Sequence, residues 1–484
     1  MRRTKIVCTI GPATRSARMV RRLIAADVDV FRINFSHGND AAHHEEVSTI
    51  RREAEALGRT VAILQDLPGP KMRVGKLREG KVELTRGSSF LLTAKSVLGD
   101  ETRVSVNYPA LLESVRKGDA IHLADGLIRL RVEENVGDGA RCTVIAGGTL
   151  SDGKGVNAPG VRTRIGFPTA QDLKHLAFGL SHSVDFIALS FVRSAENVRS
   201  VRRRLGRSES AQLIAKVEKR EAVENFDSIL KEADGIMVAR GDLGIEMPIE
   251  RVPVIQKEIV EKCNQAGKPV IVATQMLASM VSSPIPTRAE ATDVSTAVLD
   301  GADAVMLSDE TAVGRYPLET VRTLDRIARA SERGFAKYGH VRPEEERSPM
   351  EEAIAKAACR LAHYIGAKAI VAPTQTGSTA GRVSKYRPEQ PIIALCTVPA
   401  VARRMKLYWG VVPVTRKQTG TTDQLFSLAE SVAKSLRLVA RGDKMVMSSG
   451  TPGVVGSTDL IKVIEVGLHR SGARKIEQKA RRSP

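Results

Sequence analysis

Eight short apolar segments, each ending in polar or charged residues, run through the first two thirds of the chain. Their bodies are near-continuous stretches of Val, Ile, Leu and Ala, which are typical of parallel strands buried on both faces. We expect strands that start at Lys5, Asp29, Val61, Asp185, Gln212, Gly235, Pro269 and Asp303. Helical periodicity follows the segments and predicts helices over 16–27, 40–57, 169–180, 194–205, 219–231, 250–266, 287–300 and 317–337. This alternation predicts βαβ units with a parallel sheet.

Two architectures fit such units, and the strand ends favour one of them. In a (β/α)8 barrel, or TIM barrel, the residues just past the strands converge on one mouth. The alternative is an open, doubly wound sheet, but no GxGxxG follows the first segment, and polar residues close nearly every segment. We therefore expect a barrel whose strand ends carry the active site.

The barrel pattern is interrupted once and then ends, so that a chain of 484 residues divides into roughly three domains. Between 71 and 164, short strand-like pieces alternate with Gly, Asp and Asn turns, as in a small β-barrel. We expect this insert to be a lid on a barrel formed by 1–70 and 165–340. From 341 to 484, strands and helices alternate again, which predicts an open α/β domain.

Composition narrows the functional classes. The net charge of +19 invites a nucleic-acid interpretation, but the basic residues are spread along helices without interleaved aromatics. Solvated helix faces and a field that attracts small polyanions fit better. The five cysteines are far apart, which indicates reduced thiols rather than a zinc site or disulfides. No apolar run reaches the ~18 residues of a membrane span, so we expect a soluble, cytoplasmic protein that binds no nucleic acid or membrane.

Three charged residues at neighbouring strand ends suggest metal-assisted phosphate chemistry. Glu218 and Asp242 follow the fifth and sixth segments, and Lys216 precedes Glu218 by two positions. Two carboxylates suit a hard divalent cation such as Mg²⁺, while substrate oxygens and water complete its octahedron. A lone acid would more often be a solvated charge or an ion-pair partner, but two beside a lysine favour the metal. Lys216 can stabilise a phosphoryl group in transfer, or pair structurally with either acid.

Several motifs, in order, give a resemblance over essentially the whole chain. They are TKIVCTIGPAT at the start, FRINFSHG from Phe31, QDLPGPKMRVG from Gln65, DGKGVNAPG from Asp152, DFIALSFVRSAENV from Asp185, IAKVEKREAVENF from Ile214, ADGIMVARGDLGIEMP from Ala233, GKPVIVATQMLASM from Gly267 and GADAVMLSDETAVGRYP from Gly301. The chain resembles the pyruvate kinase family. This resemblance implies a barrel split by a mobile lid, followed by a regulatory domain, and usually a homotetramer.

The resemblance also implies a reaction, in which the phosphoryl group of phosphoenolpyruvate passes to ADP to give pyruvate and ATP. Mg²⁺, or Mn²⁺ in its place, would be held by Glu218 and Asp242. Arg32, Arg73 and Lys216 would hold the phosphoryl group in transfer. Backbone N–H groups of Gly241 and Asp242 lie where a helix start can bind the substrate carboxylate.

Further roles follow from the same resemblance. Thr274 would contact the substrate on the face where the enolate takes its proton, with Ser308 and Glu310 as members of a relay. The residues expected on the nucleotide side are Asn34, Ser36, His37, Arg73 and Lys154.

One departure from the family pattern predicts independence from potassium. Potassium-requiring members have D-T-K-G-P-E after the third strand, whereas this chain has Asp66, Leu67, Pro68, Gly69, Pro70 and Lys71. An ammonium carries the charge that the ion would bring, so Lys71 can replace it. The rest of the monovalent-cation pocket would be Asn34, Ser36, Asp66 and Leu67.

The last region contains a candidate effector site. A strand end, a Thr/Ser/Gly loop and a helix start follow from Pro373, which is the usual arrangement of a phosphate cradle, although an ordinary turn has even odds. By resemblance it would bind a sugar phosphate or AMP, and the loop from Ser448 could close over the ligand. The candidate residues are Thr374, Thr376, Gly377, Ser378 and Thr379.

Two other functional classes stay open at this point. A metal-dependent aldolase or lyase on the same barrel would use the carboxylates and the lysine, but it would need no nucleotide under a lid. A basic scaffold or nucleic-acid-binding protein with a degenerate barrel would need none of Lys216, Glu218, Asp242 and Thr274, all of which are present.

Overall fold

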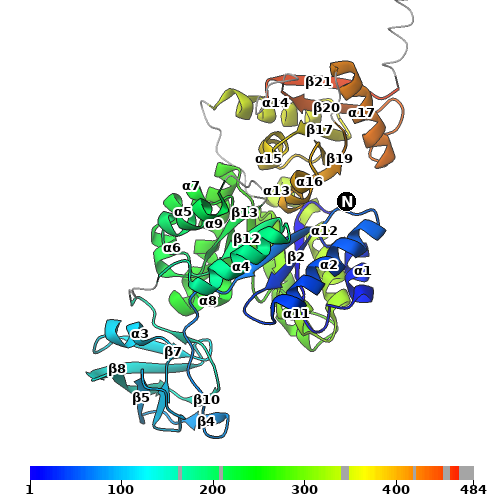
Figure 1. Ribbon diagram of the computed structural model, residues 1–484. Coiled ribbons are helices and arrows are strands. Elements are labelled where there is room, and N and C mark those ends of the chain that lie inside the picture. The colour runs from blue at the N-terminus through cyan, green and yellow to red at the C-terminus, as the bar shows by residue number, and fades with distance from the viewer. Residues whose placement is uncertain (162–165, 207–210, 340–347, 418–420, 451–457, 468–484) are drawn as a thin grey trace, which may run out of the picture.

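The computed structural model describes residues 1–161, 166–206, 211–339, 348–417, 421–450 and 458–467. Eight parallel strands close into a barrel in the order β1-β16-β15-β14-β13-β12-β3-β2 (Figure 1). Their bounds are Lys5–Thr9 (β1), Val30–Asn34 (β2), Ala62–Leu67 (β3), Phe186–Leu189 (β12), Gln212–Val217 (β13), Gly235–Ala239 (β14), Val270–Ala273 (β15) and Ala304–Leu307 (β16). The predicted barrel is confirmed, and the doubly wound alternative is wrong.

Helices cover the outside of the barrel, close to the predicted ranges. They are α1 (Ala17–Ala25), α2 (Asp40–Ala56), α4 (Ala170–Ser181), α5 (Ala195–Leu205), α9 (Val252–Ala266), α10 (Arg288–Asp300) and α12 (Pro317–Arg333). Capping boxes at Thr169 and Thr287 begin α4 and α10. Left-handed glycines, Gly267 and Gly301, end α9 and α10.

The structure differs from the predicted helices in places that carry no clear period. The range 219–231 forms two helices, α6 (Arg220–Glu224) and α7 (Phe226–Glu232). The last barrel helix stops before Gly334, and α13 (Phe335–Tyr338) follows it. Two short helices come directly after strands: α8 (Arg240–Glu246) after β14, where a helix start was expected at Gly241 and Asp242, and α11 (Asp309–Ala312) after β16, which was not predicted. Helices of four to seven residues are too short for a hydrophobic period to reveal.

Four aspartates form a ring at the floor of the barrel, where the strands begin. Each precedes an alternate strand and accepts a hydrogen bond from a backbone N–H of the neighbouring strand, and each pairs with at least one arginine. The backbone pairs are Asp29 with Ile6 (3.1 Å), Asp185 with Ile63 (2.8 Å), Asp234 with Leu213 (2.8 Å) and Asp303 with Val270 (3.1 Å). The arginines are Arg2, Arg51 with Arg403, Arg202 and Arg387. These acids are therefore occupied by structural bonds at the end opposite the mouth.

The insert after β3 is a small β-barrel, as predicted. Its strands are β4 (Lys81–Leu84), β5 (Ser89–Thr93), β6 (Arg103–Ser105), β7 (Ala120–Leu123), β8 (Ile128–Val136), β9 (Gly139–Ala146), β10 (Gly148–Ser151) and β11 (Val156–Asn157), with α3 (Pro109–Ser114) between β6 and β7. The six-stranded sheet has β11 and β6 at its edges. Bridges from Arg73 to Gly155 and from Val74 to Val106 join those edges around one apolar core. The insert projects from the barrel below α8 in Figure 1.

The last region is an open α/β sheet with strand order β19-β18-β17-β20-β21. Its strands are β17 (Ala369–Thr374), β18 (Ile392–Cys396), β19 (Val411–Thr415), β20 (Lys444–Ser449) and β21 (Leu460–Glu465). Its helices are α14 (Met350–Tyr364), α15 (Ser378–Lys385), α16 (Pro399–Arg404) and α17 (Thr422–Ser435). The antiparallel edge strand β21 was not predicted. The expected domain boundaries at 164/165 and 340/341, and much of the loop from Ser448, lie outside the described residues.

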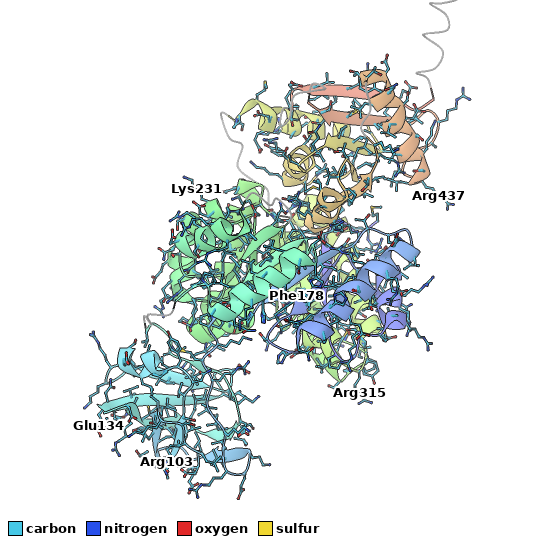
Figure 2. All side chains as sticks on the ribbon, in the orientation of Figure 1. Arg103, Glu134, Phe178, Lys231, Arg315 and Arg437 are labelled. Carbon is cyan, nitrogen blue, oxygen red and sulfur yellow. The ribbon has the colours of Figure 1, made fainter. Side chains whose placement is uncertain are left out.

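Basic side chains are found on separate parts of the molecule, with Arg103 on the insert and Lys231 and Arg315 on the barrel (Figure 2). Among the described residues, no helix has the length and apolar composition to cross a membrane. The five cysteines are buried free thiols.

Candidate active site

Lys216 lies at the centre of a cluster of side chains from three consecutive strand ends. It is the penultimate residue of β13, and its Nζ lies 2.8 Å from Glu218 Oε1 and 3.1 Å from Asp66 Oδ1. It also donates to Ser190 Oγ at 2.7 Å. Because Asp66 is the penultimate residue of β3 and Ser190 follows β12, the three strand ends meet as the barrel predicts.

Burial and charge act in opposite directions on the Lys216 ammonium. Its side chain is only 10% exposed, and burial alone would lower its pKa. Asp66 and Glu218 outweigh burial and raise the pKa above the ordinary lysine value. Burial likewise would raise the pKa of Asp66, but Lys216 and Arg32 lower it overall. Lys216 is therefore a permanently charged ammonium in the mouth.

Arg32 comes from β2 and faces the same carboxylate from the other side. Its Nε donates to Asp66 Oδ2 at 2.7 Å, and its Nη1 donates to Thr9 Oγ1 at 3.1 Å. Asp66 therefore joins the ammonium of Lys216 to the guanidinium of Arg32. Two of the three cations that were predicted to hold a phosphoryl group share this one acid, which leaves them N–H donors for an anionic ligand.

Glu218 and Asp242 provide the oxygen ligands that a divalent cation prefers. Glu218 is 1% exposed, and its Oε2 accepts from the backbone N–H of Phe191 at 2.7 Å. Burial, together with the nearby charge of Glu218, raises the pKa of Asp242 to about 6. A cation between them would relieve this repulsion, so the donor set fits Mg²⁺. In the described parts of the chain, no group of three or more His, Cys, Asp or Glu side chains forms a metal-binding cluster.

Thr274 and Gly241 are directly bonded to each other. Thr274 follows β15 and Gly241 is the second residue of α8, and the Gly241 N–H donates to Thr274 Oγ1 at 2.8 Å. Both Thr274 and Gln275 have positive φ angles, of 72° and 55°. The predicted carboxylate-binding N–H and the predicted proton-face hydroxyl therefore lie at one point of the mouth.

The Glu310 carboxylate holds two segments of the mouth together by accepting hydrogen bonds from their backbone N–H groups. The carboxylate is 2% exposed, and it accepts from Ser308 N–H at 2.7 Å and from Leu277 N–H at 3.2 Å. These bonds tie the end of β16 to the segment after β15. The relay role expected for Ser308 and Glu310 stays a prediction, since in this arrangement both carboxylate oxygens hold backbone.

Several residues expected to bind the nucleotide are basic or lie close to basic side chains. Partial burial and the charges of Lys71, Arg73 and Arg32 lower the pKa of His37. Arg73 belongs to the insert, where its Nη1 donates to the Gly153 carbonyl at 2.8 Å. Lys154 is exposed on the same side. His37 therefore lies in an electropositive environment, and the nucleotide-binding role expected for these residues stays a prediction.

Lys71 faces the acidic part of the mouth from the hinge of the insert. Burial of its ammonium, and the charge of Lys216, lower its pKa, while Asp66, Asp242 and Glu218 act in the opposite direction. The residue keeps an exposed side toward solvent.

The rest of the expected potassium pocket lies at the ends of two paired strands. Asn34 ends β2 opposite Asp66 of β3, and Leu67 is the last residue of β3. The side chain of Asn34 accepts from Ser36 N–H at 3.1 Å, which orders the turn after β2. Asp66, which belongs to this expected pocket, is one of the carboxylates that Lys71 faces.

The candidate phosphate cradle lies in the C-terminal sheet, at the junction of β17 and α15. Gly377 has a φ of 97° and donates its N–H to Thr374 Oγ1 at 2.9 Å. Other residues rarely adopt this positive φ, and a Cβ at Gly377 would also require Met405 Cε, 2.5 Å away, to move. Thr376 Oγ1 donates to Ser378 Oγ at 3.2 Å, and Thr379 pairs with Thr458 at 3.0 Å. The hydroxyls and the helix start are gathered as predicted, and an anion there stays a prediction.

Sequence reasoning gave no role to two polar side chains at strand ends. Ser190 bonds Lys216 from the end of β12, and Arg240 bonds the backbone around Thr274. Both are polar residues at strand ends, which was the available signal.

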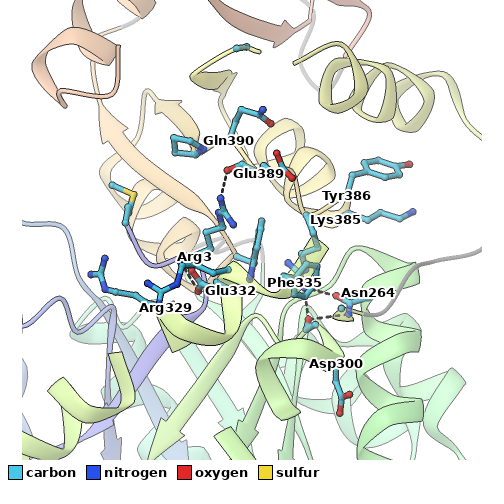
Figure 3. Close-up of a pocket in the computed structure, with 18 of the residues that line it drawn as sticks. Arg3, Asn264, Asp300, Arg329, Glu332, Phe335, Lys385, Tyr386, Glu389 and Gln390 are labelled. Carbon is cyan, nitrogen blue, oxygen red and sulfur yellow. Dashed lines mark hydrogen bonds between the residues drawn. The ribbon is translucent and has the colours of Figure 1, made fainter. Parts of the chain in front are cut away.

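A cavity of about 950 Å³ lies far from this cluster, between the floor of the barrel and the C-terminal sheet. Arg3, Phe335 and Tyr386 border it (Figure 3). None of the predicted catalytic residues lines it.

Comparison with known proteins identifies relatives along the whole chain. The family described as "Pyruvate kinase, barrel domain" matches residues 1–321, and "Pyruvate kinase, alpha/beta domain" matches residues 352–464. The pyruvate kinases of Sporosarcina psychrophila and Geobacillus stearothermophilus are each 45% identical to 96% of this chain, which covers 81% and 80% of their lengths. That of Clostridium acetobutylicum is 41% identical, with 96% and 99% covered. The crystal structure of a pyruvate kinase from Cryptosporidium parvum superposes with a TM-score of 0.88 at 38% identity, over 96% of both chains.

Proposed function

The chain belongs to the pyruvate kinase family and is a phosphotransferase of this type; from this premise we propose how its residues carry the phosphoryl group from phosphoenolpyruvate to ADP. The observation that carries the proposal is the Lys216 ammonium, held by Asp66, Glu218 and Ser190 where three strand ends meet. A fixed charge in a buried mouth can stabilise the phosphoryl group in transfer and the enolate that it leaves.

The other mouth residues bind and orient the two substrates. Arg32, held by Asp66, and Arg73, from the insert, grip the phosphoryl group between them. The N–H groups of Gly241 and Asp242 receive the carboxylate, and Thr274 contacts the face where the enolate is protonated. Ser308 and Glu310 carry the proton relay. The nucleotide is bound by Asn34, Ser36, His37, Arg73 and Lys154.

Glu218 and Asp242 hold Mg²⁺ or Mn²⁺. Their crowding, which raises the pKa of Asp242, supports this assignment. When bound, the ion neutralises charge on the phosphoryl oxygens. The residues around the mouth exclude water, hold the acceptor ADP and keep Lys216 charged.

Lys71 makes the enzyme independent of potassium. Its ammonium faces Asp66, Glu218 and Asp242. It can therefore balance the negative charge that a monovalent ion would otherwise balance. Turnover with potassium replaced by tetramethylammonium tests this. Sustained turnover is expected, and a collapse to a few per cent (roughly 30-fold) would refute it.

Regulation and assembly are expected to follow the family. We divide the chain into a barrel (1–70 and 165–340), a lid (71–164) and a regulatory domain (341–484), assembled as a homotetramer in the cytoplasm. The cradle at 374–379 would bind a sugar phosphate or AMP. Thermal shifts with a panel of phosphates would show the effector, and no shift with any of them would exclude this role.

The deciding assay is ATP formation from phosphoenolpyruvate and ADP, coupled to a reporter, with and without Mg²⁺. We expect magnesium-dependent ATP formation that Glu218→Gln and Asp242→Asn each reduce by about 100-fold. Consumption of phosphoenolpyruvate without ATP would instead favour a lyase-type reaction on the same barrel.

A further inference from the structure

The backbone just past β15 is held in an uncommon conformation. Thr274 and Gln275 both lie in the left-handed region, with φ angles of 72° and 55°. Side chains rarely adopt this region, and β-branched threonine is among the least suited to it. Such a conformation persists only where the surroundings fix it, and it occurs preferentially at functional sites.

Arg240 supplies the fixing contacts. It is the first residue of α8, and its Nη2 donates to the Thr274 carbonyl at 2.7 Å while its Nε donates to the Ala273 carbonyl at 3.3 Å. One planar guanidinium therefore holds two successive carbonyls of the turn. A lysine ammonium on a flexible stem cannot reproduce this fork.

The Arg240 guanidinium also contacts side chains of two barrel helices. Its Nη1 donates to Asp293 Oδ1 of α10 at 2.6 Å and approaches Gln256 Oε1 of α9 at 3.4 Å. The Arg240 side chain is 15% exposed, so it lies within the wall of the barrel and not in the mouth. The contacts link α8, α9, α10 and the end of β15 at one point.

The fixed backbone determines where the Thr274 hydroxyl lies. Its Oγ1 accepts from Gly241 N–H, and its own proton is directed to the Ala273 carbonyl. A substrate carboxylate that takes the Gly241 N–H would release this hydroxyl. The contacts of Arg240 with the Ala273 and Thr274 carbonyls would then still hold the backbone at Thr274 in place.

We propose that Arg240 is a positioning residue for the reaction, which holds the strained 274–275 turn so that the Thr274 hydroxyl stays aligned when substrate displaces its bond to Gly241. The proposal rests on the role given to Thr274 under the proposed function. A bare structural ion pair between Arg240 and Asp293 is the alternative, and two variants separate them.

Arg240→Lys keeps the ion pair and loses the fork, whereas Asp293→Asn keeps the fork and loses the charge of its partner. The proposal expects Arg240→Lys to lower kcat about 100-fold while the KM for phosphoenolpyruvate changes less than about 3-fold. Asp293→Asn should stay within about 3-fold in kcat. Equal losses in both variants, or a loss in KM alone, would overturn the proposal.

A double-mutant cycle tests the strain directly. Gln275 is exposed, so Gln275→Gly removes little packing and relieves the positive φ at that position. Alone it should leave kcat within about 2-fold, and in its background Arg240→Lys should cost at least about 5-fold less than in the wild type. An unchanged cost would contradict a role in holding strained backbone.

Hydrogen–deuterium exchange gives a readout that needs no activity. In Arg240→Lys, amide exchange should accelerate about 10-fold or more across 274–277 and stay unchanged in α10. Unchanged exchange in 274–277 would overturn the proposal. A wild-type enzyme that forms no ATP would instead refute the proposed function, while the exchange data would still decide whether Arg240 holds the turn.

Discussion

Two buried lysines at opposite ends of the same barrel have opposite electrostatic environments. In the mouth, Asp66 and Glu218 both lie within 3.1 Å of Lys216, and its pKa is raised. At the floor, burial lowers the pKa of Lys5 to about 7, although Asp29 acts in the opposite direction. The two side chains are similarly covered, at 10% and 6% exposure.

The difference arises from how many cations share each acid. Asp29 pairs with Lys406 at 2.6 Å and with Arg2 at 2.8 Å, and Lys5 is left 4.0 Å away. Lys216 has two carboxylates within 3.1 Å, and Arg32 shares one of them, Asp66. Burial alone therefore does not determine whether a lysine is charged. In the mouth, the neighbouring carboxylates keep Lys216 charged.

The largest expected effect is on turnover. Lys216→Met should lower kcat by about 1,000-fold or more, because the charge that stabilises the phosphoryl group and the enolate is removed. Lys5→Met is the matched control at the floor, and it should retain kcat within about 3-fold. Steady-state assays of both variants at saturating Mg²⁺ measure this, and comparable losses would erase the functional distinction between the two ends.

Reversing the charge of Lys71 is expected to have the next largest effect. Lys71→Glu adds an acid beside Asp66, Glu218 and Asp242, so the variant should need a monovalent cation to be active. Potassium should stimulate it about 30-fold, whereas Lys71→Met serves as the uncharged control with a smaller requirement. Titration of potassium against tetramethylammonium measures the requirement, and a variant indifferent to potassium would contradict the assigned role.

The two lysines should also differ in how stability depends on pH. Lys5 has a folded-state pKa of about 7, below the ordinary value near 10.4. The unfolded chain then binds more protons between these values, so the wild type should gain up to ~1.4 kcal/mol per pH unit from pH 7 to 10. Lys5→Met should lack this gain. Urea midpoints at pH 7.5 and 9.5 measure it.

Lys216 provides the contrast for that experiment. Its folded-state pKa is raised, so its contribution is complete below its unfolded pKa and is lost only at more alkaline pH. The stability difference between the wild type and Lys216→Met should therefore be flat from pH 7.5 to 9.5. A slope like that of Lys5→Met would show that the two environments are alike.

The smallest effect concerns Asp242 without metal. Its folded-state pKa of about 6 lies above the ordinary value near 3.9, so stability falls as pH rises between these values. In EDTA, Asp242→Asn should stabilise the protein by roughly 1–2 kcal/mol at pH 7.5, and this gain should shrink toward pH 4. Urea unfolding at both pH values tests it, and a destabilised variant at pH 7.5 would contradict the proposed crowding with Glu218.

Sequence patterns predicted the mouth well because the ends of the strands can be recognised in the sequence. The apolar bodies of the strands and the polar residues after them located Lys216, Glu218, Asp242 and Thr274 before any contact was known. A closed barrel then brings those ends together by geometry alone.

The floor and the wall were not predicted, for physical reasons. The ring of aspartates depends on pairing between strand starts and arginines that are distant in sequence, such as Asp185 with Arg403. The contact of Arg240 with the Thr274 carbonyl depends on backbone angles that cannot be inferred from the residue types in the sequence. Lys216 and Lys5 look alike in sequence, and only the count of neighbouring charges separates them.

The central claim is that the charged cluster in the mouth passes a phosphoryl group directly to ADP. A single-turnover experiment with enzyme in excess over phosphoenolpyruvate labelled on phosphorus tests it most directly. With Mg²⁺ and ADP, the label should appear in the γ-phosphate of ATP, and Lys216→Met should abolish this transfer. Label released as inorganic phosphate, or transfer that persists in Lys216→Met at the wild-type rate, would contradict it.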